Sequence, residues 1–197
     1  MFVMIAGLVI FLGIHSVRIF AEDWRTGQIA ARGENVWKGI YSAISLAGLV
    51  LIVWGYGLTR EAPMPAWNLA VWDPPLLLRH VALTLNAVAF FLAAQNAGPA
   101  GPVTARLGHP MVLAVKVWAF AHLISNVRLA DIILFGSILA WAVADFSAAK
   151  RRDRQAGTVR VAGPWRNDLI PGAVGLALWA AFIWGLHKWL IGVSVFG

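Results

Sequence analysis

Long runs of apolar residues, separated by short polar connections, dominate the chain. A helix that crosses the hydrocarbon core of a membrane needs about 20 predominantly apolar residues. Six stretches approach this length and pattern: Phe2–Phe20, Gly39–Leu58, Pro75–Ala94, His109–Asn126, Leu129–Phe146 and Ile170–Val193. The pattern predicts an all-α integral membrane protein, a bundle of about six transmembrane helices that forms one domain over residues 1–197.

The composition supports a membrane protein and excludes other classes. Of the 197 residues, 60% are apolar and 13% are charged, whereas soluble domains have about 45–50% and about 25%. A disordered chain and an ordinary soluble enzyme are therefore excluded. The absence of cysteine excludes disulfides, thiolate ligands and covalently attached heme. The many tryptophans suit residues at membrane boundaries, and Trp24, Trp37, Trp54, Trp67, Trp72, Trp165 and Trp189 are predicted there.

The basic residues are distributed unequally between the connections. Residues 21–38, 95–108 and 149–168, together with Arg18, hold eleven Lys and Arg, whereas the remaining connections with Arg79 hold three. The positive-inside rule places the richer connections in the cytoplasm. We therefore expect a multi-pass membrane protein with both termini outside the cytoplasm.

The net charge of +7 does not by itself indicate a nucleic-acid partner, because the basic residues lie between apolar runs. We expect the lipid bilayer as the main partner and no nucleic acid. The densest basic run, Lys150–Arg154, is interpreted as an orientation signal that also contacts anionic lipid headgroups. Its alternative interpretation is a docking site for an acidic partner or RNA.

All five histidines fall within or at the ends of the predicted spans. Ionisable side chains are costly there, so each is a functional candidate, and neutral imidazole is a common ligand for heme iron and other metals. His80 and His122 each lie about five residues from the same predicted membrane surface, on neighbouring antiparallel helices. Depth therefore favours these two as a ligand pair in the outer half, and His15 and His109 belong to the inner half.

Helical phase gives the neighbours of these histidines. On the fourth predicted helix, His122 shares a face with Trp118 and Asn126, and an amide there can orient an imidazole. Lys116 lies mid-span and can pair with a carboxylate or a heme propionate, or extend to the membrane surface. His109 precedes Pro110, a pattern typical of a helix start. For His187 a hydrogen-bonded packing role is favoured.

On the first predicted helix, Gly7 and Gly13 are small residues of the kind that allow another helix to approach closely.

Several segments resemble the NnrU family, whose members are bacterial integral membrane proteins associated with nitric oxide and nitrite metabolism. The resemblance rests on His-Ser in the first span, Arg-His in the third and Gly-His-Pro followed by Lys-x-Trp-x-x-x-His in the fourth. These motifs lie in the segments Phe11–Ile19, Trp37–Gly57, Trp72–Leu83, Gly108–Asn126 and Ile133–Asp145.

The NnrU family is related to the plant 15-cis-zeta-carotene isomerase, a membrane enzyme that holds heme b through histidine. This resemblance implies heme b and favours His15 with His122 as its ligands, whereas depth favours His80 with His122. The expected function is a heme-binding role in nitrogen-oxide metabolism, with redox, sensing or isomerase-like activity. The alternative is a cofactor-free accessory or assembly factor for nitrite or nitric oxide reductase. Denitrification enzymes or a small apolar ligand are the further partners that this implies.

Overall fold

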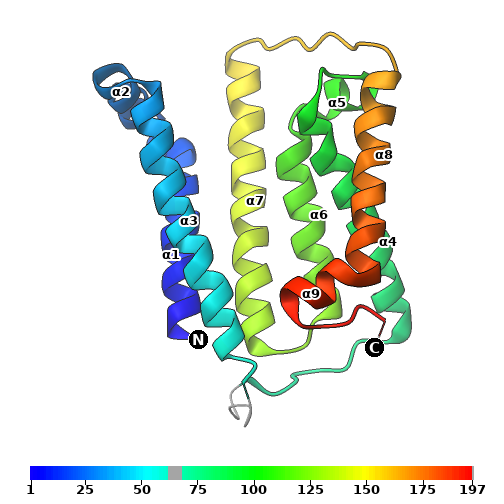
Figure 1. Cartoon of the computed structure of the whole chain (residues 1–197). Helices are drawn as coiled ribbons and strands as arrows, with labels where there is room; N and C mark the ends of the chain where they lie inside the picture. The colour runs from blue at the N-terminus through cyan, green and yellow to red at the C-terminus, as the bar shows by residue number, and fades with distance from the viewer. Residues whose placement is uncertain (62–67, 197) are drawn as a thin grey trace. The chain divides into compact units, whose positions relative to one another are not determined.

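The computed structural model describes residues 1–61 and 68–196, and this part of the chain is predominantly helical (Figure 1). The helices are α1 Phe2–Phe20, α2 Glu22–Arg32, α3 Glu34–Leu58, α4 Leu76–Ala94, α5 Pro102–Leu107, α6 Pro110–Ser125, α7 Leu129–Gln155, α8 Arg166–Ala181 and α9 His187–Ile191. Short 3-10 and π-helical segments, Gln95–Ala97 and Phe182–Leu186, follow α4 and α8. Trp67, predicted at a membrane boundary, lies outside the described residues.

The predicted all-α membrane fold is confirmed. All six predicted stretches form helices, and α1, α3, α7 and the extended segments Leu76–Ala97 and Arg166–Ile191 are long and apolar enough to cross a membrane. The remaining predicted stretch, His109–Asn126, forms α6. This helix has 16 residues, fewer than the roughly 20 that a membrane crossing needs. The number of six spans therefore stays a prediction.

Two short helices, α2 and α5, were not expected. Helix α2 carries Glu22 and Asp23 in its first turn and Arg32 in its last, and it has no buried residue. Acidic side chains at the N-terminus of a helix and basic ones at its C-terminus interact favourably with the helix dipole. Because α2 has no apolar run, the sequence pattern assigned its residues to a connection.

The described residues divide into two compact units. Unit 1 comprises the described residues of Met1–Pro74 and Asn126–Ala149, and unit 2 comprises those of Pro75–Ser125 and Lys150–Gly197. Helix α7 contributes its first 21 residues to unit 1 and the turns from Lys150 onward to unit 2. The single domain over residues 1–197 stays a prediction.

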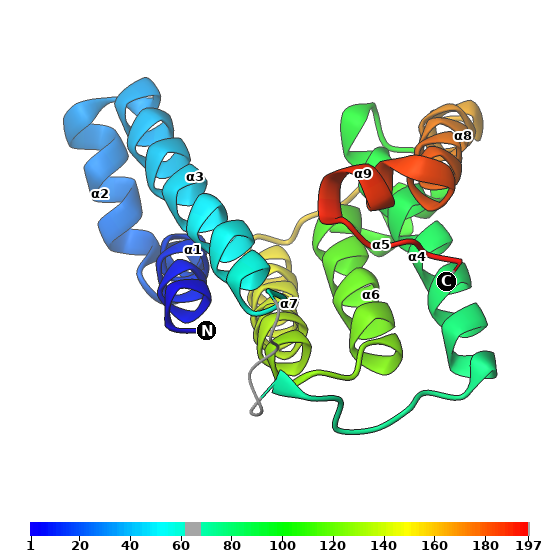
Figure 2. The same ribbon diagram turned by 60° about the horizontal axis from the view of Figure 1, so that its bottom comes forward.

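In unit 1, α1 and α3 pack along each other (Figures 1 and 2). A Cβ atom built on Gly7 would lie 2.6 Å from the Ile52 amide nitrogen, and one on Gly48 would lie 2.8 Å from the Phe11 amide nitrogen. Only glycine fits such contacts, which confirms the predicted role of Gly7. At Gly13 no described atom outside the neighbouring backbone of its own helix lies within 4 Å of that position, so the described residues show no close helix contact at this glycine.

Polar contacts join the end of α3 to the start of α7 within unit 1. The Tyr56 hydroxyl donates to an Asp131 carboxylate oxygen at 2.5 Å. The buried Asn68 amide donates to the Thr59 carbonyl at 2.7 Å and accepts from the Ala130 amide at 3.0 Å. These bonds satisfy polar groups that have little access to water.

In unit 2, α4 packs against α6 and α8, and the buried Asp168 fixes the connection between α4 and α6. Its carboxylate accepts from the Val103 amide at 2.7 Å and from the Thr104 amide and hydroxyl at 3.2 and 2.7 Å. A carboxylate in this position caps the N-terminus of α5. The cap holds the segment that leads to Gly108 and His109 against the start of α8.

Candidate functional site

His122 is half-buried in α6, and its ring orientation is set by its own helix. The ring Nδ1 lies 2.9 Å from the Trp118 carbonyl oxygen. Because a carbonyl only accepts, Nδ1 carries the proton and the lone pair of the neutral ring is on Nε2. The Trp118 ring also contacts the imidazole, with centroids 4.9 Å apart. Trp118 thus lies beside His122, as predicted from helical phase.

His15, in α1 of unit 1, has the same local arrangement. Its Nδ1 lies 2.6 Å from the Phe11 carbonyl oxygen, so its lone pair is also on Nε2. The rings of Phe11, Tyr41 and Trp141 surround the imidazole at centroid distances of 4.1, 5.1 and 5.7 Å. His15 is therefore held in an aromatic environment that keeps water away from one side of the ring.

His80 is exposed in the second turn of α4. Its backbone carbonyl accepts a hydrogen bond from the Thr84 hydroxyl at 3.1 Å. Helices α4 and α6 pack against each other in unit 2, but no group of three or more histidine or carboxylate side chains in the described ranges is arranged to hold a metal ion. The pairing of His80 with His122 stays a prediction.

Lys116 and Asn126, the other predicted site residues, are both half-buried. Lys116 lies on α6, six residues before His122. Helix α6 ends at Ser125, so Asn126 is the first residue after the helix rather than part of its last turn. Their roles beside a bound group stay predictions.

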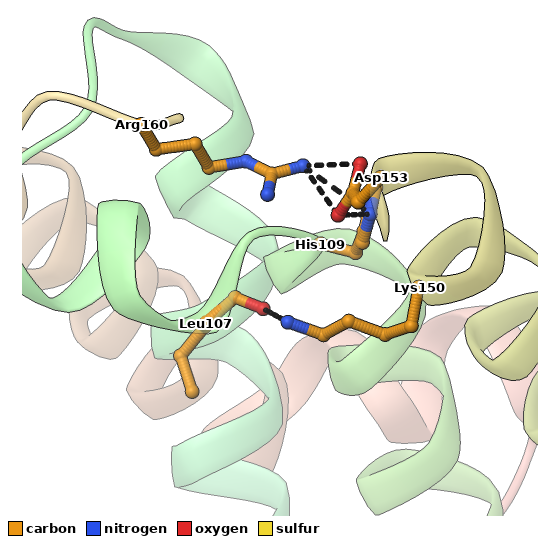
Figure 3. A network of polar contacts seen from close by, with 5 residues as sticks. All are labelled: Leu107, His109, Lys150, Asp153 and Arg160. Atoms are coloured by element: carbon orange, nitrogen blue, oxygen red, sulfur yellow. Dashed lines mark hydrogen bonds and ion pairs between the residues drawn. The ribbon is translucent and has the colours of Figure 1, made fainter. Parts of the chain in front are cut away.

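His109 belongs to a polar network at the end of unit 2 where α6 begins (Figure 3). Its Nε2 lies 2.8 Å from Asp153 Oδ2. Arg160 Nη2 donates to Asp153 Oδ1 at 2.9 Å and forms an ion pair with Oδ2 at 2.9 Å. The His109 carbonyl accepts from the Leu113 amide at 3.1 Å, so His109 begins the helix as predicted. Its side chain, however, contacts Asp153 instead of the helix.

Asp153 and Arg160 were not among the predicted site residues. Asp153 is the one acid within the basic run from Lys150 to Arg154, and this position is a signal that could have identified it. A carboxylate among so many cations is well placed to organise them. Lys150 of the same run donates from Nζ to the Leu107 carbonyl at 2.8 Å, as Figure 3 shows.

Comparison with known proteins identifies one family. The family described as NnrU protein matches residues 3–195, nearly the whole chain. No curated protein and no solved structure matches.

Proposed function

We propose that this chain, which belongs to the NnrU family, is a multi-pass membrane protein of nitrogen-oxide metabolism that binds heme b through membrane-embedded histidines. The observation that carries the proposal is the position of His122 within the apolar helix α6, with its Nδ1 bonded to the Trp118 carbonyl. A histidine ligand of a metal characteristically donates its other ring nitrogen to a carbonyl or carboxylate, which fixes the tautomer.

Two of the predicted ligands, each taken by itself, have the ring orientation that a heme ligand needs. His122 and His15 both direct Nδ1 to a main-chain carbonyl, so each imidazole has the tautomer that ligates iron through Nε2. Lys116, on the same helix as His122, supplies a cation of the kind that pairs with a heme propionate. Heme b, when bound, supplies an iron centre for electron transfer or for binding a small ligand.

The protein's own contribution is to hold and orient His122 through the carbonyl and the ring of Trp118. His80 and His15 are the two candidates for the second heme ligand, and the substitutions described in the Discussion distinguish them. Depth along the predicted spans favours His80, and the resemblance to the isomerase favours His15.

The optical spectrum of the purified protein tests this proposal. We expect a Soret band in the oxidised protein and sharp α and β bands after reduction, because two imidazole ligands make heme iron low-spin. The protein should be expressed with an ample heme supply, and its helical circular dichroism measured in parallel. A folded but colourless preparation would contradict heme binding and support the accessory or assembly role instead.

We also propose that both termini lie outside the cytoplasm of a bacterial inner membrane. The eleven-to-three distribution of basic residues supports this orientation. A fluorescent protein that folds only in the cytoplasm, fused after Gly197, should stay dark, and alkaline phosphatase at the same position should be active. A bright fusion with inactive phosphatase would reverse the proposed topology.

A further inference from the structure

Two cationic side chains of unit 2 converge over the backbone of Gly108. A Cβ atom built on this glycine would lie 2.9 Å from Arg160 Nη1 and 3.3 Å from Lys150 Nζ. The sum of these distances limits the separation of the two nitrogens to 6.2 Å. Gly108 has φ +82°, a conformation that favours glycine, and its missing side chain leaves room for both cations.

The surrounding contacts hold the two cations in place. Arg160 uses Nη2 to bind Asp153, and its Nη1 lies on the side of Gly108. Lys150 Nζ donates to the neutral Leu107 carbonyl. Residues 150–160 contain five basic residues and a single acid, Asp153, so this segment carries an excess of positive charge even when His109 is neutral.

We propose that Lys150 and Arg160, positioned over Gly108, bind the phosphate group of an anionic phospholipid. An oxygen that accepts from two charged nitrogens at about 2.8 Å each can bridge a separation of up to about 5.6 Å. A phosphate, whose oxygens are themselves spaced apart, can span the full range that the geometry allows. Arginine and lysine are the two side chains that most often bind phosphate.

The segment around Arg160 favours a lipid over a soluble anion. Val159 and Val161, on either side of Arg160, are 86% and 84% exposed, and Trp165 is 62% exposed. Exposed apolar side chains next to an anchored arginine suit a segment that lies at the bilayer surface, where tryptophan is enriched. The valines then contact acyl chains at the level where Arg160 meets the headgroup phosphates.

The exposed Arg154 provides a matched control for this site. It lies in the same last turns of α7 as Lys150, and Arg154→Gln removes one positive charge, as Arg160→Gln does. General attraction to an anionic surface responds similarly to both substitutions. A phosphate site at Gly108 responds to only one of them.

The test is native mass spectrometry of the full-length protein in detergent, titrated with phosphatidylglycerol or phosphatidylcholine. We expect Arg160→Gln to weaken phosphatidylglycerol binding about tenfold, because a hydrogen bond to a charged group is lost, and Arg154→Gln to weaken it less than about twofold. Lys150→Gln should resemble Arg160→Gln, and it decides the matter if the latter fails to fold. Binding of phosphatidylcholine should be weaker and unaffected.

Three results would overturn the proposal. Equal losses in Arg160→Gln and Arg154→Gln would show that only overall charge matters. Unchanged phosphatidylglycerol binding in folded Arg160→Gln and Lys150→Gln proteins would remove these residues from any lipid site. Release of the bound lipid by inorganic phosphate, in the wild-type protein but not in these variants, would assign the site to a soluble anion.

Discussion

Replacing His122 with alanine is expected to reduce the heme content of the purified protein to less than about one tenth of the wild-type value. Loss of a residue that only orients a metal ligand already weakens binding by about 10–100-fold, and removal of the ligand itself should have at least this effect. The Nδ1 bond to the Trp118 carbonyl disappears with the ring, whereas the helix that carries it needs no side chain at this position. The heme-to-protein ratio, measured by the pyridine hemochrome assay, provides the test.

His187→Ala is the matched control. His187 also directs Nδ1 to a main-chain carbonyl, that of Val193 at 2.8 Å, but it lies in α9 close to the end of the chain. Its expected role is packing, so this variant should retain its heme. Full retention of low-spin heme in His122→Ala would contradict the whole assignment of ligands.

The same assay assigns the second ligand. Loss of low-spin heme in His80→Ala, with retention in His15→Ala, would support the argument from depth in the predicted spans. The reverse result would show that the argument from depth fails and that the resemblance to the isomerase identifies the ligands correctly.

The long helices could be predicted because lipid imposes one simple requirement. A spanning helix must be apolar over about 20 residues and must satisfy its own backbone hydrogen bonds, so composition alone reveals α1 and α3. The same criterion fails for α2, whose charged side chains suit the membrane surface, and for the six residues of α5. Helix α5 depends on Asp168, a cap that lies more than 60 residues away in the sequence.

The candidate site was predictable only where the signal is local. His109 followed by Pro110 indicates a helix start, and the four-residue spacing of Trp118 and His122 places both on one face of a helix. The bonds of Asp153 to His109 and Arg160 depend on tertiary structure, since His109 lies 44 residues away. In the sequence, Asp153 resembles one more solvated charge in a polar run.

Glycines illustrate the same limit. Gly7 and Gly13 are equivalent by residue type, yet only Gly7 meets backbone of α3. Whether a glycine marks a helix contact depends on the crossing point of two helices, which composition does not define. Gly55, which was not singled out from the sequence, makes an even closer contact with α1.

Replacing Gly55 with alanine is therefore expected to destabilise unit 1 substantially. A Cβ atom at this position would lie 2.7 Å from Met4 Cα and closer still to the Met4 amide nitrogen. These are backbone atoms of α1, and the Met4 side chain is fully buried, so neither can move aside without separating α1 from α3. In membranes, such close approach is itself the source of helix association.

The matched control for this prediction is Gly39→Ala in the same helix, where no described atom outside the neighbouring backbone of α3 lies within 4 Å of the added Cβ. This variant should be as stable as the wild type or more stable, because alanine within a helix is more favourable than glycine by about 0.5–1 kcal/mol. Overpacking costs about 1–3 kcal/mol, and at roughly 2–4 °C per kcal/mol Gly55→Ala should melt about 2–12 °C below the wild type. Thermal unfolding in detergent, followed by circular dichroism, measures both. Equal melting temperatures for the two variants would show that α1 and α3 do not meet at Gly55.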